Sequence, residues 1–362
     1  MNFAPNLYCD VFAAFIFYVL YLTLRNTRWR CFYTSRCSKK KISWYRVDPQ
    51  TGKLALQGNV PVPGEPSVQG VDPSRRFLYA AIRSTGQLCS FRIDPQSGQL
   101  EHLHTINTGL EDPAYMATDH MGRYLITPYY ASGKVTVYAI GDDGAAREPP
   151  LSSVYTAPHA HGFAIDQSNR YAFVPHTCPG NSVWQLTFAD GILQSNTPPR
   201  VEFDREVGPR HLHIHPDNGC AYSVNEQDNS VTAYRFDPAS GTLTPFQTLS
   251  TVPGDYQGGA CARMELHPSG RFLYATNRGH DSLAGFRIYP QSGALKSIGQ
   301  FPTEQNPRSF HFDPQGRFLY AAGESNDRLR AYRLDDQSGA LDPLHTYETG
   351  HVPWWVQVVE PG

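Results

Sequence analysis

The residues best suited to chemistry in this chain are imidazole, carboxylate and guanidinium groups in short Pro- or Asn-containing segments. The main candidates are His161, Arg210, Glu226, Arg278 and Arg308. Histidine or glutamate can act as a general base, and arginine binds carboxylate or phosphate through two parallel hydrogen bonds. These residue types together suit an anionic, oxygen-rich ligand whose reaction needs proton transfer and charge stabilisation.

Other kinds of site find less support. His159 and His161 have the spacing of a metal-binding pair, but no carboxylate cluster completes the set, so we expect no metal. The chain has neither a Gly-x-Ser-x-Gly nucleophile motif nor a Gly-x-x-x-x-Gly-Lys phosphate loop. We therefore expect neither a covalent serine hydrolase nor a nucleotide enzyme, and no cofactor.

A repeat with a spacing of 46 to 52 residues positions these candidates. Its clearest copies are 72–79, 267–274 and 313–320, where a Pro-containing turn leads into Phe-Leu-Tyr. Pro and Gly in the turn favour a tight connection between two antiparallel strands. A third strand follows in every unit, at 42–45, 88–91, 135–138, 183–186, 231–234, 283–286 and 329–332. A Gly-bearing turn then leads to a fourth, outer strand.

Four strands per unit of about 48 residues, repeated seven times, predict an all-β, seven-bladed propeller with antiparallel blades. The N-terminal end supplies strands at 32–34 and 42–45 but no inner strand, whereas 354–359 forms an inner strand at the C-terminus. We therefore expect the closing blade to be shared between the two chain ends. Residues 30–362 form the propeller domain in this prediction, and 1–29 lie outside the repeat.

The register of the repeat places the candidates at one mouth of the ring. Two positions of the repeat matter here. The first position begins each inner strand, six residues before the turn proline, and the second position follows the end of each second strand. Because the two strands are antiparallel, these positions share one face. The first position holds Ser67, Ala114, His161, Arg210, Ala262, Arg308 and Trp355, and the second holds Arg83, Tyr130, Thr177, Glu226, Arg278 and Glu324.

Charged groups at strand ends bind something or pair with one another. We interpret Arg210 and Glu226, which face one mouth from one blade, as functional. Arg83 and Glu324 are better explained as salt bridges between blades.

Four further side chains complete the set at the mouth. His159 and His211 are candidate substrate-binding residues, and Trp354 and Trp355 are core or pocket wall. His215 belongs to the turn register, and we interpret it as structural.

Composition narrows the partners. The formal net charge is −2, and the longest run of like charge is 39–41, so we expect no nucleic-acid partner. The seven cysteines include no Cys-x-x-Cys pair, which suits reduced thiols and a cytoplasmic protein. We expect this protein to be a monomer or a homodimer.

Residues 11–24 form an uncharged apolar run, shorter than the roughly 20 residues of a membrane span. This run could be a weak membrane anchor, a helix packed on the domain, or an extension without function.

Several segments carry a family resemblance. They are 158–161 (Pro-His-Ala-His), 208–211 (Gly-Pro-Arg-His), 224–226 (Val-Asn-Glu), 230–234 (Ser-Val-Thr-Ala-Tyr), 276–283 (Thr-Asn-Arg-Gly-His-Asp-Ser-Leu), 303–304 (Thr-Glu) and 307–310 (Pro-Arg-Ser-Phe). Through them, residues 32 to 360 resemble the seven-bladed propeller lactonase family. That family includes propeller-type 6-phosphogluconolactonases of bacteria and a carboxy-muconate lactonizing enzyme of fungi.

The resemblance implies roles for particular residues. The family's catalytic His and Glu match His161 and Glu226, and its substrate arginines match Arg210 and Arg278. The chain departs from the family pattern at His176, where members often have Asp, and at Arg263, where many have an acidic residue.

The resemblance implies a hydrolase of a sugar lactone, in the first place 6-phosphogluconolactone of the pentose phosphate pathway. In this interpretation His161 or Glu226 activates water, Arg210 and Arg278 hold phosphate or the developing oxyanion, and Arg308 adds an anion contact. One alternative is a carboxy-muconate cycloisomerase that runs lactone chemistry in the other direction. The other is a propeller that acts as a binding platform without catalysis.

Overall fold

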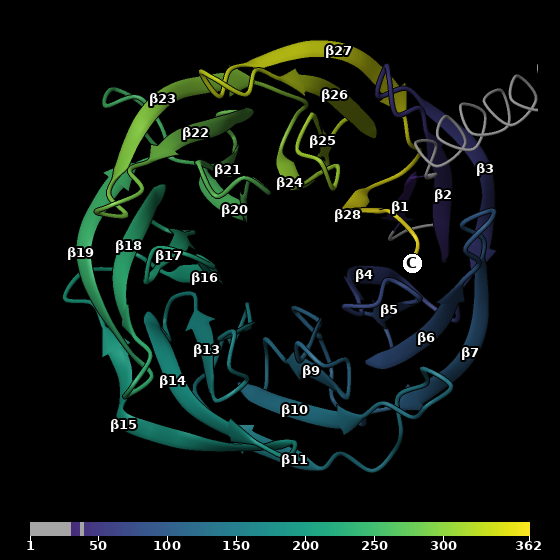
Figure 1. Ribbon diagram of the computed structural model, residues 1–362, viewed down its shortest axis with the longest axis horizontal. Helices are drawn as coiled ribbons and strands as arrows, with labels where there is room; N and C mark the ends of the chain where they lie inside the picture. Colours follow the sequence, from purple (N-terminus) through teal and green to yellow (C-terminus); the bar gives the residue numbers. More distant parts are fainter. Residues whose placement is uncertain (1–29, 37–39) are drawn as a thin grey trace, which may run out of the picture.

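The computed structural model describes residues 30–36 and 40–362. Seven antiparallel four-stranded sheets surround a central axis, and the chain runs around the ring once (Figure 1). The predicted seven-bladed propeller is confirmed. The predicted boundary at residue 30 and the apolar run 11–24 lie at or outside the edge of the described residues.

The strands of each blade are named in order from the central axis outwards. The closing blade contains β28 (Pro353–Val359), β1 (Arg30–Arg36), β2 (Lys41–Val47) and β3 (Leu54–Pro61). The second blade contains β4 (Pro66–Val71), β5 (Phe77–Ile82), β6 (Gln87–Ile93) and β7 (Leu100–Asn107). The third contains β8 (Ala117–Thr118), β9 (Tyr124–Pro128), β10 (Lys134–Ala139) and β11 (Ser152–Tyr155). The fourth contains β12 (Ala164–Ile165), β13 (Tyr171–His176), β14 (Ser182–Ala189) and β15 (Ile192–Glu202). The fifth blade contains β16 (Pro209–Ile214), β17 (Cys220–Asn225), β18 (Ser230–Asp237) and β19 (Thr242–Ser250). The sixth contains β20 (Ala260–Leu266), β21 (Phe272–Arg278), β22 (Ser282–Ile288) and β23 (Leu295–Pro302). The seventh contains β24 (Pro307–Phe312), β25 (Phe318–Gly323), β26 (Arg328–Leu334) and β27 (Leu341–Glu348).

The inner strands of two blades are shorter than the repeat predicts. β8 and β12 have two residues each, and His161 lies before β12 rather than on it. An isolated bridge between Ala160 and His176 replaces regular pairing there, next to His159, whose φ is +64°. His161 therefore reaches the mouth from an irregular segment.

Neighbouring blades are joined by apolar packing and by a repeated hydrogen bond. The tyrosine of the second strand donates its hydroxyl proton to a carbonyl in the outer turn of the next blade. Tyr79 donates to Gly144 O at 3.0 Å, and Tyr320 donates to Gly52 O at 2.8 Å. The second of these bonds crosses the point where the ring closes. The tyrosine shared by the sequence repeats thus links each of these blades to the next.

Buried aspartates fix the turns between inner and second strands. Asp72 and Asp313 accept backbone N–H groups from Phe77 at 2.6 Å and from Phe318 at 2.7 Å. His215 replaces Asp in one blade, and its Nδ1 accepts the backbone N–H of Asp217 at 3.1 Å. The structural interpretation of His215 agrees with these contacts.

Closure joins the two chain ends in one sheet, as predicted. β1 pairs with β28 in antiparallel register, with Phe32 opposite Val358. Arg30 then donates to Asp313 of the preceding blade at 2.6 Å, and the two side chains are 5% and 0% exposed.

The Arg30–Asp313 pair is expected to contribute strongly to stability. Arg30→Met leaves the Asp313 carboxylate buried without its cation, so we expect a loss of about 3–5 kcal/mol in the free energy of unfolding. Urea titration measures this loss. The matched control is Arg92→Met, because Arg92 pairs with Glu101 at 3.0 Å on the surface and should matter by less than about 1 kcal/mol. Equal effects of the two substitutions would contradict a role of the pair in closure.

The described part of the chain contains no helix long and apolar enough to cross a membrane. Within the same residues, no group of three or more His, Cys, Asp or Glu side chains is arranged to hold a metal ion. The five cysteines of this part are free thiols.

Candidate active site

A cavity of about 170 Å³ opens at the mouth that the repeat register singles out. Both register positions contribute to its wall, because inner strands begin and second strands end on this face. The lining residues are Val68, Arg83, Asp112, Pro113, Ala114, Tyr130, His161, Arg210, Glu226, Arg308, Trp354 and Trp355.

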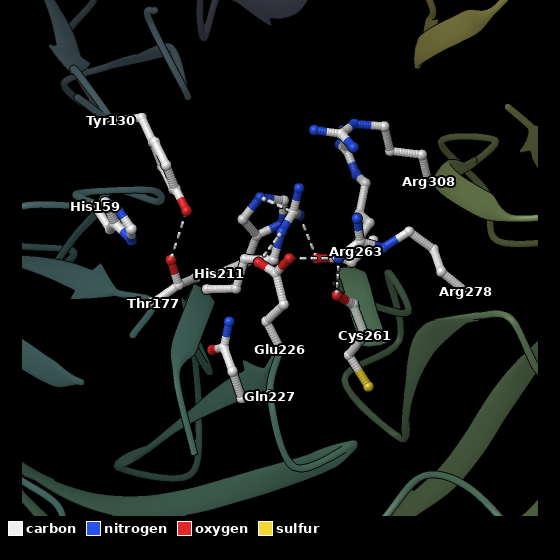
Figure 2. Close-up of polar contacts among 12 residues, drawn as sticks. Tyr130, His159, Thr177, His211, Glu226, Gln227, Cys261, Arg263, Arg278 and Arg308 are labelled. Atoms are coloured by element: carbon white, nitrogen blue, oxygen red, sulfur yellow. Dashed lines mark hydrogen bonds and ion pairs between the residues drawn. The ribbon is translucent and has the colours of Figure 1, made fainter. Parts of the chain in front are cut away.

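Two arginines hold Glu226: Arg210 from the same blade and Arg278 from the next blade. Nε of Arg210, on β16, donates to Oε2 of Glu226 at 3.1 Å, and Nη2 of Arg278, at the end of β21, donates to Oε1 at 2.5 Å. Figure 2 shows Glu226 and Arg278 facing each other. Further bonds to backbone carbonyls fix both guanidiniums: Arg210 Nη1 donates to Ala262 O at 2.5 Å, and Arg278 Nη2 to Cys261 O at 3.0 Å.

This cluster is charged and largely enclosed. Burial by itself would raise the pKa of Glu226, but the positive charges of Arg210 and Arg278 lower it below its ordinary value. Burial lowers the pKa of Arg210, although a guanidinium stays protonated in proteins. Two cations against one carboxylate leave one positive charge in surplus. Such a surplus in a low-dielectric site favours an anion or a developing negative charge.

His161 lies in the same cavity as a neutral imidazole. It is 8% exposed, and its Nδ1 has no hydrogen-bond partner within the described chain. Burial, and then the charges of Arg210 and Arg308, lower the pKa of His161 well below its ordinary value. At neutral pH the ring therefore has a free lone pair that can accept a proton.

Arg308 lies over an indole at the edge of the cavity. Its guanidinium carbon is 3.8 Å from the ring centroid of Trp354, and its Nη1 lies 3.5 Å from Oε2 of Glu324 on the same blade. Arg83 contacts Trp354 as well, at 4.9 Å.

The interpretation of Arg83 and Glu324 as salt bridges between blades is therefore partly wrong. Arg83 does pair across blades, with Asp112 at 3.0 Å, but Glu324 pairs within its own blade. Because Arg83 also lines the cavity, its role is not confined to holding blades together. Trp354 was predicted to be either core or pocket wall, and it forms part of the pocket wall.

Comparison with known proteins assigns the family. Residues 31–358 match the family model described as Lactonase, 7-bladed beta-propeller. The chain belongs to this lactonase family. It is 33% identical to the 6-phosphogluconolactonase of Pectobacterium carotovorum subsp. carotovorum (strain PC1) over 328 residues, which cover 90% of this chain and 98% of that protein. It is 30% identical to the 6-phosphogluconolactonase of Bacillus subtilis (strain 168), over 69% of this chain and 74% of that protein.

A solved structure in the same size range supports this assignment. The periplasmic gluconolactonase of Pseudomonas aeruginosa superposes on this lactonase-family chain with a TM-score of 0.84 and 28% identity. The superposition covers 91% of this chain and 99% of that one. The family assignment thus rests on the whole ring of blades.

Three of the candidate substrate residues lie outside the cavity wall of this lactonase-family propeller: Arg278, His159 and His211. Arg278 contacts the wall through its hydrogen bond to Glu226. His159 stacks on Tyr130 with ring centroids 4.2 Å apart (Figure 2). His211 is 2% exposed, and its Nε2 lies 3.2 Å from Nη1 of Arg210. The two histidines therefore support cavity residues rather than form its surface.

Asp112, which lines the cavity and pairs with Arg83, was not among the residues predicted from the sequence. It lies in the connection before β8 with φ of +59°, outside both register positions. Pro113, directly after it, was the available signal, because a proline precedes the first register position in four blades.

A second cavity, of about 380 Å³, lies towards the turn side of the axis, and Trp355 lines both cavities. Arg263 lines only the second one. Its guanidinium lies 3.6 Å from the Trp355 ring centroid and donates to Oε1 of Glu265 at 2.6 Å. Arg263, one of the two departures from the family pattern, thus lies in the second cavity and not in the wall around Glu226.

Proposed function

We propose that this propeller hydrolyses the ring ester of a sugar lactone, with 6-phosphogluconolactone of the pentose phosphate pathway as substrate. The observation that carries the proposal is one cavity that combines neutral His161 with Glu226 held between Arg210 and Arg278. The named relatives support the substrate class. A platform without catalysis would need no such convergence of an imidazole with a surplus of guanidinium charge.

His161 is the general base in this proposal. Both oxygens of Glu226 already accept guanidinium hydrogens, whereas Nδ1 of His161 has no hydrogen-bond partner within the described residues. His161 accepts a proton from water as the water oxygen attacks the lactone carbonyl. The C–O ring bond then breaks, the ring oxygen takes the proton from His161, and the product is an open-chain hydroxy acid. Every proton is accounted for within the substrate, the water and His161.

Arg210 and Arg278 stabilise the negative charge that develops on the carbonyl oxygen. Glu226 fixes the two guanidiniums before substrate arrives, so no reorganisation is needed in the transition state. Arg308 adds a further anion contact at the edge of the cavity. His159 and His211 contribute by holding Tyr130 and Arg210 in place.

The proposed partner is a small anionic lactone, and neither a cofactor nor a nucleic acid takes part. We propose a cytoplasmic enzyme, because the free thiols of the described chain suit a reducing compartment. A monomer or homodimer remains the prediction for its assembly. Anchoring through residues 11–24 stays the alternative, and those residues lie outside the described chain.

The pH dependence tests the state of His161. With uncharged glucono-lactone as substrate, kcat/KM follows the free enzyme, whose active form has neutral His161. The ordinary pKa of a histidine is 6.5, and burial together with Arg210 holds the pKa of His161 well below that value. We therefore expect kcat/KM to stay level from pH 7.5 to below pH 6.5. Arg308→Gln removes a positive charge, so it should move the acid limb to higher pH. An acid limb above pH 6.5 in the wild type would contradict a neutral, buried base.

A direct substrate comparison tests the function. Purified protein is assayed for proton release from 6-phosphogluconolactone and, in parallel, for absorbance change with a carboxylated muconate. Turnover of the phosphorylated lactone above its spontaneous hydrolysis is the expected result. Turnover of the muconate alone would assign the cycloisomerase activity instead.

A further inference from the structure

Two arginines from different blades lie over one indole ring at the edge of the cavity. Trp354 is on β28 of the closing blade, and Arg308 and Arg83 come from the blades on either side of it. Their guanidinium carbons lie 3.8 Å and 4.9 Å from the Trp354 ring centroid. Contact with an indole face stabilises a guanidinium and limits its rotamers. The two cations are thus fixed at the mouth before any ligand binds.

These guanidiniums are less fully engaged than those around Glu226. Within the described residues, Arg83 contacts Asp112 and Arg308 contacts Glu324, each through one terminal nitrogen. The Arg308–Glu324 separation is 3.5 Å. Side-chain exposures of 38% for Arg83 and 16% for Arg308 show that both can be reached from the mouth. Each therefore keeps N–H groups available to a ligand.

The local charge count also favours an anion. The four arginines 83, 210, 278 and 308 face the three carboxylates of Asp112, Glu226 and Glu324. One positive charge is left over, and it belongs to the neighbouring Glu226 cluster, because Arg83 and Arg308 each face one carboxylate. Glu226 and two backbone carbonyls already engage Arg210 and Arg278, so the pair on Trp354 has the larger number of free donors.

We propose that Arg83 and Arg308, positioned by Trp354, form a subsite for a phosphoryl group on the substrate. A phosphate monoester carries close to two negative charges and three strong acceptor oxygens, which match forked guanidinium donors. The inference rests on the proposed lactone hydrolysis and adds that substrates are selected by a phosphate away from the reacting carbonyl. Arg83 is then a specificity-determining residue, and Trp354 positions it.

The test compares two substrates that differ only in the phosphate. We would measure kcat/KM of the wild type, Arg83→Gln and Arg308→Gln with 6-phosphogluconolactone and with glucono-lactone. Arg92→Gln is the matched control, because Arg92 pairs with Glu101 at 3.0 Å on the same blade as Arg83 but outside the cavity.

Each cavity variant should lose about 10- to 100-fold with the phosphorylated lactone, the worth of a charged hydrogen bond. With glucono-lactone, Arg83→Gln should stay within about threefold of the wild type, and Arg92→Gln should stay there with both substrates. An equal loss on both lactones, or none on either, would overturn the subsite.

A binding measurement separates this inference from the proposed activity. Calorimetry with 6-phosphogluconate and with gluconate needs no turnover. The wild type should bind the phosphorylated acid more tightly, and Arg83→Gln should reduce this difference about 10- to 100-fold. If neither lactone is hydrolysed but this difference holds, the proposed function fails and the subsite stands. If the wild type binds both acids equally, the subsite is wrong whatever the activity.

Discussion

Replacing His161 with alanine is expected to lower kcat for lactone hydrolysis about 100- to 10,000-fold, the usual contribution of a general base. The reason is that the cavity holds one neutral imidazole, whereas both oxygens of Glu226 already accept hydrogen bonds from arginines. Binding of the lactone should change far less than kcat. Initial rates over a range of substrate concentrations separate the two effects.

The fold should tolerate this change, because Nδ1 of His161 forms no hydrogen bond within the described residues. Thermal unfolding checks that point. His102→Ala is the control, since His102 is exposed on the outer strand β7 and far along the blade from the mouth. If His161→Ala kept more than about a third of the wild-type kcat, the base would have to be another group, with Glu226 the next candidate.

Arg210→Lys is expected to lower kcat/KM about 100- to 1,000-fold, the typical cost of one lost donor to a developing oxyanion. Lysine keeps the charge but cannot reproduce the guanidinium fork. Arg210 uses Nε for Glu226 and Nη1 for Ala262 O, and an ammonium group cannot make both bonds in that geometry. The loss should therefore appear although the net charge of the cavity is unchanged.

Arg263→Lys provides a matched comparison for Arg210→Lys. Arg263 is as deeply buried as Arg210, at 3% exposure each, and it also pairs with a glutamate. It lines only the second cavity. Both substitutions should lower the unfolding temperature, but only Arg210→Lys should lower kcat/KM by more than about tenfold. Parallel losses of activity in both would show that the effect is one of stability.

The sequence repeat was enough to predict the ring, its closure and the mouth that carries the site. The Pro-containing turns and the shared tyrosine have direct structural causes: the turns are held by buried side chains such as Asp313, and the tyrosines link blades. The same register brought His161, Arg210, Glu226 and Arg308 to one cavity wall.

What the register could not predict lies where the chain leaves the regular strand geometry. Asp112 reaches the cavity from a connection with a left-handed backbone, so no strand position points to it. The partners of Arg83 and Glu324 depend on side-chain directions that spacing does not define. The repeat also did not reveal that Trp355 divides the axis into two cavities, because strand register says nothing about how side chains fill the centre.

The central claim is that the mouth containing Arg210 and Glu226 is where the lactone is hydrolysed. The most direct measurement is proton release from 6-phosphogluconolactone by the wild type, Arg210→Ala and Glu226→Gln, each corrected for spontaneous hydrolysis. We predict rapid turnover by the wild type and a loss of at least about 100-fold in both variants. Wild-type turnover that persists unchanged in both folded variants would place the reaction elsewhere and contradict the claim.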